Sequence, residues 1–310
     1  MPNWNDVFRE IQERQNLFLN ESKQSQYQSD NALIDIRRKY LSELHKYTTR
    51  NILAYYSGYL SKPGISGSEI TDEDKNGFMM AIHKMDRKKG LDLILHTPGG
   101  GIAATESIAH YLHQMFGNNI RAIVPQICMS AGTMLACACK SIVLAKHSNL
   151  GPTDPHISNI PALGVIEEFK RAAREIKRDQ SKINVWRPIL SQYRPTFIGQ
   201  CEDAIKWTEE FVTNELKNNM LSIDSDKERK AKEIAKMLMD KKNNKSHGRH
   251  LHLDKLKKAG LIVEQLEDDD NLQDLVLTVH HCYMHTLMNT TAIKIIENHN
   301  GVALAKTTIQ

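Results

Sequence analysis

Two turns rich in small residues constrain the fold of this chain more than any other feature. An apolar run over 91–95 leads into the turn Thr97–Gly100, and a second turn, Met129–Thr133, follows later in the chain. Pro98 has no amide donor, but the two glycines after it can expose bare N–H groups in conformations closed to other residues. Such amides can hold an oxyanion, so the two turns together predict an acyl-transfer site.

Each turn is expected at a junction between a strand and a helix. The run 91–95 predicts a buried strand, and apolar residues recur at helical spacing over 102–116. A second strand over 121–127 leads to Ser130, and the small residues that follow suit a tightly packed helix start. Ser130 is therefore expected at a helix N-terminus, where free amides and partial positive charge stabilise an anion. This position makes the Ala131 amide a candidate oxyanion donor.

Patterns typical of strands and helices alternate over 51–145, which predicts α/β architecture. Before this block we expect a helix from Asn5 to about Leu19, a polar linker, and a helix from about Asn31 to Leu44. After it the sequence predicts mainly helices and then a terminal β-hairpin, since Asn-Gly is a strong hairpin signal. The predicted helical segments are 165–182, stretches within 185–221, 226–242 and 272–287, and the hairpin turn is 298–301.

The residues of the two turns resemble the Clp protease and crotonase superfamily, most closely the serine dehydrogenase proteinase family related to signal peptide peptidase A. This resemblance implies a fold of stacked β-β-α units, here with additional N-terminal helices and a C-terminal helical segment plus β-hairpin. The matching segments are Pro98–Gly100, Ser130–Thr133, 141–145 and Gly151–Pro152, with weaker likeness over 50–57, 246–248 and 292–298.

On this resemblance the chain divides into four segments. Residues 1–48 form an N-terminal helical segment, and 49–160 form the crotonase-like α/β catalytic core. Residues 161–245 form a helical cap or oligomerisation region. Residues 246–310 supply a core-completing helix, the C-terminal helix and the hairpin. Related folds commonly assemble into rings or barrels, so a homo-oligomer is implied.

The resemblance also implies an activity, namely a serine peptidase that cleaves peptide bonds through an acyl-enzyme at Ser130. The Gly99, Gly100 and Ala131 amides would stabilise the tetrahedral oxyanion. The substrate is then a peptide or protein, and neither cofactor nor metal is expected. No nucleotide-binding motif is present to drive unfolding, so a partner unfoldase stays open.

The base that takes the Ser130 proton is ambiguous at the level of sequence, because relatives use either histidine with aspartate or a lysine. Clp-type subunits place histidine in the region that here holds Asp154 and His156. They place aspartate where this chain has His247. An exchange of the acid and base positions gives the preferred triad of Ser130, His247 and Asp154.

Three other residues remain alternative bases: His156, Lys170 and Lys182. A lysine buried in an apolar cleft loses its charge and can accept the serine proton near neutral pH. Lysine-dyad relatives carry that lysine where this chain has 162–164, so the pattern departs from that subgroup. On an amphipathic helix a lysine is more often solvated.

Other kinds of site fit the residues less well. Cys128 precedes the serine turn instead of starting the helix, so a cysteine nucleophile is disfavoured. No nearby cysteine or carboxylate set in the sequence completes a zinc site with the clustered histidines. Two alternative functions are a catalytically inactive Clp-like scaffold or effector subunit, and a crotonase-type acyl-CoA enzyme that needs no nucleophile. The histidines considered are His247, His250, His252, His281 and His285.

The composition is that of a globular protein, since 310 residues with 40% hydrophobic content can bury one large core or two modest ones. The formal net charge of +4 is too small and too scattered to indicate a nucleic-acid partner. No apolar run approaches the roughly 18 to 20 residues of a membrane span. Residues 1–6 lack the basic and apolar regions of a signal peptide, so we expect a cytoplasmic protein.

Overall fold

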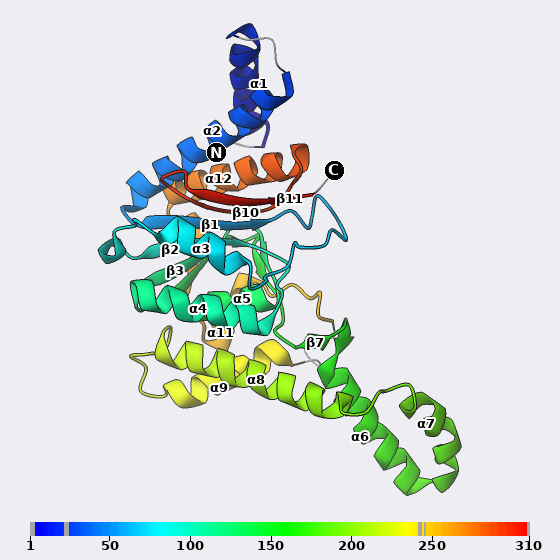
Figure 1. The fold of residues 1–310 in the computed structure, drawn as a ribbon. Helices are drawn as coiled ribbons and strands as arrows, with labels where there is room; N and C mark the ends of the chain where they lie inside the picture. Colours follow the sequence, from blue (N-terminus) through cyan, green and yellow to red (C-terminus); the bar gives the residue numbers. More distant parts are fainter. Residues whose placement is uncertain (1–3, 22–24, 241–243, 245, 309–310) are drawn as a thin grey trace.

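A seven-stranded sheet lies at the centre of the computed structural model, which describes residues 4–21, 25–240, 244 and 246–308 (Figure 1). The sheet order is β11 (Ala303–Thr307), β10 (Ala292–Asn298), β1 (Asn51–Ser57), β2 (Leu91–His96), β3 (Ile120–Val124), β5 (Ser141–Leu144) and β9 (Val263–Gln265). In this sheet β1, β2, β3, β5 and β9 run parallel, and the hairpin of β10 and β11 adds to β1 in antiparallel orientation.

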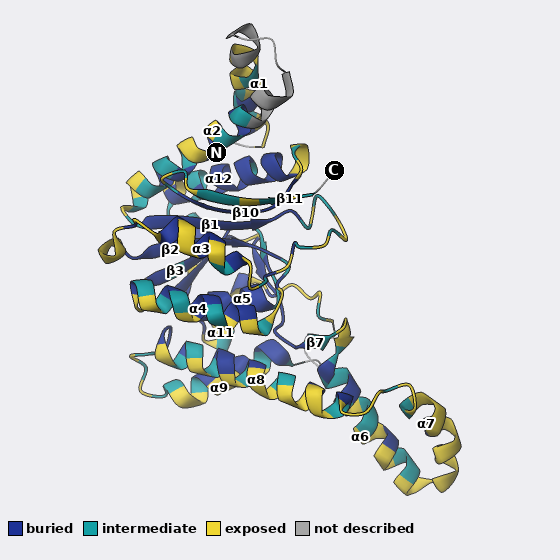
Figure 2. Ribbon diagram, in the orientation of Figure 1, coloured by how far each residue is buried: buried dark blue, intermediate teal, exposed yellow. Residues whose placement is uncertain are grey.

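The parallel strands β1, β2 and β5 are buried on both faces, which explains their largely apolar sequences (Figure 2). Leu93 packs into one core, while its neighbour Ile94 packs into the other, because successive side chains of a strand point to opposite faces. The first core includes side chains from α3 (Asp74–Ile82), α4 (Ile102–Phe116) and α5 (Ala131–Cys137), and the second includes side chains from α2 (Ser25–Thr48) and α12 (Asp270–Asn289).

The expected α/β fold is confirmed, with α1 (Trp4–Glu21) and α2 before the sheet and the β10–β11 hairpin at its end. Helix α2 begins before Asn31, since the serine and glutamine residues there also tolerate a helix. Residues 1–3, and 241–242 at the predicted end of the polar helix, lie outside the described residues. The remaining helices are α6 (Ala162–Arg178), α7 (Ile183–Leu190), α8 (Phe197–Asn218), α9 (Lys227–Met239) and α11 (Leu253–Ala259), with 3-10 turns η1 (Arg87–Lys89), η2 (Gln180–Lys182) and η3 (Leu266–Asp268).

The strand predicted over 121–127 is wrong in its extent, because the chain divides it into β3 and a separate strand β4 (Ile127–Cys128). Pro125 lies between them, and a proline cannot donate to a sheet ladder. Strand β4 instead pairs in parallel with β6 (Asn149–Leu150), away from the central sheet. A further short hairpin consists of β7 (His156–Ile157) and β8 (Ile160–Pro161).

Helices α6 and α7 reach away from the sheet as an arm, whereas α8 and α9 lie beneath α4 and α5 (Figure 1). Ala162 and Val165 of α6 pack with Phe197 and Cys201 of α8, so a small core of its own holds the base of the arm. Within the described ranges we find no helix with the length and apolar character needed to cross a bilayer.

Candidate active site

Three backbone pairings bring distant parts of the chain to one place. Thr97 pairs in parallel with Cys128, which pairs in parallel with Leu150, and Leu150 pairs in antiparallel orientation with Leu251. Their hydrogen bonds include Met129 N–H to Thr97 O at 3.0 Å and Leu251 N–H to Leu150 O at 2.8 Å. A ladder of four segments results.

Strand direction determines which residues meet at one end of this ladder. Residues that follow Thr97, Cys128 and Leu150 emerge at the same end, since these segments are parallel. Residues that precede Leu251 emerge there too, because its segment is antiparallel. The residues expected toward this end include those of the preferred site, namely Gly99, Gly100, Ser130, Ala131, Asp154 and His247.

Ser130 occupies the N-cap position of α5 but does not behave as a cap. Its backbone has φ 51° and ψ −117°, and its side chain makes no capping hydrogen bond. An ordinary N-cap serine has extended backbone and accepts a hydrogen bond from an amide of the first turn. The Ser130 side chain is partly exposed, so it is accessible to solvent and ligands. Backbone strain of this kind concentrates at functional sites.

The glycine turn lies directly against the serine turn. Gly99 has φ 99°, and a Cβ added there would lie 2.7 Å from Ser130 Cβ and 2.9 Å from Ala131 N. Gly132 is equally confined, because its added Cβ would lie 2.5 Å from Thr97 Cγ2. A side chain at either glycine would therefore push the two turns apart.

The amides of these turns are not equivalent. Gly99 N–H donates to Thr97 Oγ1 at 3.1 Å, so this amide is already occupied. Ile70 bonds the turn on either side of Gly100, donating to Gly99 O at 2.7 Å and accepting from Gly101 N–H at 2.9 Å. Gly100 and Ala131 donate to no group in the described part of the chain, which leaves their N–H groups available to an anion.

Asp154 and His247 form a close pair, although 93 residues separate them in the sequence. His247 Nδ1 lies 2.8 Å from Asp154 Oδ1. The Asp154 carboxylate is buried, whereas the His247 side chain is a third exposed. A carboxylate on Nδ1 fixes the imidazole tautomer and leaves Nε2 able to accept a proton. A histidine that is hydrogen-bonded to a carboxylate in this way can act as a general base.

His156 completes a cluster with this pair. Its Nδ1–H donates to the Asp154 carbonyl oxygen at 3.1 Å, and its ring centroid lies 4.1 Å from that of His247. Burial lowers the pKa of His156 and the neighbouring His247 lowers it further, against the smaller opposing effect of Asp154. The neutral form of His156 is therefore favoured.

The surroundings of the two candidate lysine bases and of the candidate cysteine nucleophile do not suit those roles. Lys170 on α6 and Lys182 in η2 are exposed, so neither has the burial that a neutral lysine base requires. Burial raises the pKa of the Cys128 thiol well above its ordinary value, which keeps it protonated and unreactive.

The remaining histidines do not join the cluster at the ladder. His250 and His252 are exposed, while His285 of α12 lies against Trp4, with ring centroids 3.9 Å apart. The grouping of His156 with His247 was missed because no local spacing in the sequence connects them.

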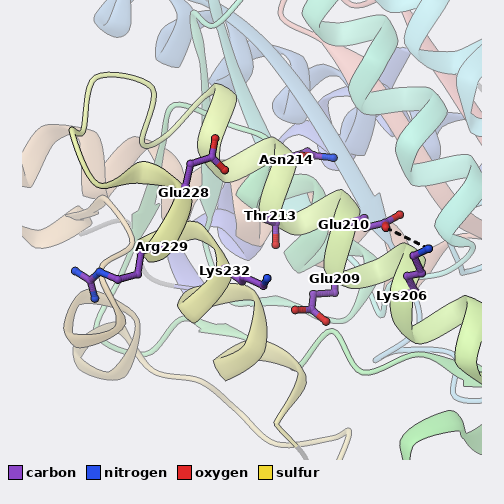
Figure 3. A pocket seen from close by; sticks show the side chains of 8 residues that line it. All are labelled: Lys206, Glu209, Glu210, Thr213, Asn214, Glu228, Arg229 and Lys232. Atoms are coloured by element: carbon purple, nitrogen blue, oxygen red, sulfur yellow. Dashed lines mark ion pairs between the residues drawn. The ribbon is translucent and has the colours of Figure 1, made fainter.

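A groove of 600 Å³ lies elsewhere, between α8 and α9 (Figure 3). Acidic and basic side chains both line it, and Lys206 pairs with Glu210 at 3.8 Å. None of its lining residues belongs to the ladder, so we do not assign the acyl-transfer chemistry to it. They are Lys206, Glu209, Glu210, Thr213, Asn214, Glu228, Arg229 and Lys232.

The α/β fold and the two apposed turns define a protein of the ClpP-like class. A family model described as "ClpP-like SDH-type serine proteinase" matches residues 24–301, and the chain belongs to this family.

Two proteins of Methanocaldococcus jannaschii, both described as uncharacterized, are among its relatives. MJ0137 is 30% identical over 214 residues, which cover 69% of this chain and 65% of that protein. MJ1495 is 33% identical over 194 residues, which cover 63% of this chain and 59% of that protein. The aligned part of the chain thus spans less than two thirds of either relative.

Proposed function

We propose that the protein is a serine peptidase that cleaves peptide bonds through an acyl-enzyme at Ser130. The observation that carries this proposal is the strained Ser130 backbone, held against a glycine turn that has no room for a side chain. Membership of a ClpP-like serine proteinase family supports the same chemistry.

In the proposed reaction Ser130 Oγ attacks the scissile carbonyl carbon while His247 Nε2 takes the hydroxyl proton. Asp154 accepts the hydrogen bond from His247 Nδ1–H and stabilises the imidazolium. The tetrahedral intermediate collapses as His247 returns the proton to the leaving amine. Water, activated by the same imidazole, then hydrolyses the acyl-enzyme.

We assign the oxyanion hole to the Gly100 and Ala131 amides. Loss of one oxyanion donor typically raises the barrier by about 2.7 to 4 kcal/mol, so these amides matter nearly as much as the base. Gly99 contributes through its missing side chain, because its own amide bonds Thr97 Oγ1.

The proposal extends to the setting of the enzyme. The substrate is a peptide or protein, and the active form is a cytoplasmic homo-oligomer in which 161–245 serves as a cap and oligomerisation region. Exposed apolar side chains on the α6–α7 arm, Ile183, Val185 and Ile189, support an assembly role for that region.

A fluorophosphonate probe tests the nucleophile, because it reacts covalently with an activated serine. Wild-type protein should be labelled, Ser130→Ala should not, and Ser107→Ala within helix α4 should label normally. A well-folded but unlabelled wild-type protein would favour the scaffold, and the acyl-CoA enzyme predicts the same absence of labelling.

The identity of the base is tested by the rate of labelling. General base catalysis typically contributes 10²- to 10⁴-fold, so His247→Gln should slow labelling by about this factor. His156→Gln should slow it much less. The opposite order would assign the base to His156.

A further inference from the structure

The cluster of Asp154, His156 and His247 offers a chemistry that the proposed triad does not use. Each residue offers one ligand atom, and these three atoms lie within 4.8 Å of one another. Two imidazole nitrogens with a carboxylate oxygen are a common donor set for Zn²⁺ in proteins. Among the described residues, no other group of this kind was found.

His156 has no part in the proposed triad, yet it is oriented as a metal-binding histidine. Its Nδ1–H donates to the Asp154 carbonyl oxygen at 3.1 Å, since a carbonyl can only accept. This bond fixes the tautomer and leaves the lone pair on Nε2 free. Histidines that bind metals almost always donate their other ring N–H to a carbonyl, carboxylate or water in this way.

The distances within the cluster require only small movements to hold an ion. Tetrahedral Zn²⁺ with bonds of about 2.0 to 2.2 Å needs ligand atoms about 3.3 to 3.6 Å apart. Asp154 Oδ1 lies 2.8 Å from His247 Nδ1, and one ligand atom from each of the three residues lies within 4.8 Å of the other two. The side chains of His156 and His247 are 23% and 33% exposed, so an ion can reach them from solvent.

We propose that Asp154, His156 and His247 form an inhibitory site for Zn²⁺ or a similar transition-metal ion. This inference rests on the proposed function, because it is the loss of His247 as base that makes the ion inhibitory. The bound ion occupies an imidazole lone pair and the carboxylate that orients the ring, so Ser130 loses its proton acceptor. Mg²⁺ and Ca²⁺ prefer oxygen ligands and leave the site empty.

Isothermal titration calorimetry with Zn²⁺, and visible absorption with Co²⁺, test the site without reference to activity. We expect saturable binding of one ion per chain, both in the wild type and in Ser130→Ala. His156→Gln should weaken binding at least tenfold, while His250→Gln, which alters an exposed histidine outside the cluster, should leave it unchanged. Mg²⁺ should show no saturable binding.

Inhibition is measured as the rate of fluorophosphonate labelling. Zn²⁺ should slow labelling of the wild type, a chelator should restore it, and His156→Gln should need at least tenfold more Zn²⁺. The proposal is overturned if Zn²⁺ binding does not saturate, if His156→Gln binds as the wild type does, or if bound Zn²⁺ leaves labelling unchanged. If metal-free protein is not labelled at all, the result contradicts the proposed peptidase activity and not the metal site. The calorimetric titration tests the metal site independently of that activity.

Discussion

At Ser130 the backbone conformation and the proposed chemistry are coupled. A residue with a side chain at φ 51° and ψ −117° is strained, and conformations of this kind typically cost about 1 to 3 kcal/mol each. In this conformation the side chain makes no capping hydrogen bond at α5, and the Ala131 amide has no hydrogen-bond partner within the described segments. Catalytic geometry and local stability are therefore in conflict at this residue.

This conflict predicts an unusual order of stability among Ser130 variants. Glycine tolerates positive φ, so Ser130→Gly should be more stable than Ser130→Ala by about 1 kcal/mol, although both remove the hydroxyl. Chemical denaturation of the two variants measures this difference.

The matched control is Ser107 within α4, where the backbone is helical. There the order should reverse, with alanine more stable than glycine by about 1 kcal/mol, because glycine is a poor helix former. If alanine were also the more stable replacement at Ser130, the strained conformation would not persist in solution.

At the scale of elements, residues 69–71 form a strap, a segment that is hydrogen-bonded to the glycine turn at the edge of the proposed site. Ile70 bonds Gly99 O and Gly101 N–H through its backbone. The buried Lys294 of β10 is bonded to the strap, since its Nζ donates to Glu69 O at 2.6 Å. The same Nζ donates to Asp74 Oδ1 at 2.7 Å.

Asp74 anchors the other end of the same strap. Its carboxylate accepts from Thr71 N–H at 3.0 Å and from Tyr55 O–H at 2.8 Å. Burial lowers the pKa of Lys294, against a smaller opposing effect of the Asp74 carboxylate. A hairpin strand at the end of the chain thus supports the proposed oxyanion turn.

Removal of the Lys294 cation should loosen this strap. Lys294→Met leaves Asp74 buried and unpaired, which typically costs about 3 to 5 kcal/mol of stability. The double variant Lys294→Met/Asp74→Asn removes both charges and should recover most of that loss. Hydrogen exchange at the Ile70 and Gly101 amides should still be at least tenfold faster than in the wild type, because Glu69 O has lost its donor. Wild-type exchange rates in the double variant would show that Lys294 does not position the turn.

Local chemistry explains which parts of this site could be predicted from the sequence. The strand-to-helix junctions at Gly99 and Ser130 follow from adjacent apolar patterns and small residues, and the structure has both. The break between β3 and β4 was missed although Pro125 signals it. Contacts such as Lys294 with Asp74, 220 residues apart, depend on the order of strands in the sheet, which no local pattern encodes.

At the scale of the whole molecule, buried histidines determine how far the pH can fall before the fold loses stability. His96 at the end of β2 is fully buried, and its Nδ1–H donates to Ile127 O at 3.2 Å. Its Nε2 has no partner among the described residues, so nothing stabilises a second ring proton. Burial lowers the pKa of His96 from 6.5 to about 4, against the smaller opposing effect of the bond to Ile127. Burial also lowers the pKa of His280, well below 6.5.

These lowered pKa values predict how stability changes with pH. A histidine that is neutral in the fold but protonated when unfolded contributes its full stability above pH 6.5. That contribution is lost as the pH falls from 6.5 toward 4, by up to about 1.4 kcal/mol per pH unit for His96. Denaturation midpoints of the wild type should therefore fall steadily across this window.

His96→Gln removes one of the titrating groups. The slope of the unfolding free energy against pH should therefore decrease by up to about 1.4 kcal/mol per pH unit, which corresponds to one proton. The slope is informative even if the variant is less stable at every pH, because a constant loss does not change it. His83→Gln, an exposed histidine on the outer surface, should keep the wild-type slope. An unchanged slope in His96→Gln would mean that His96 binds its proton equally in both states, and that the ladder end beside Thr97 is open to water rather than sealed.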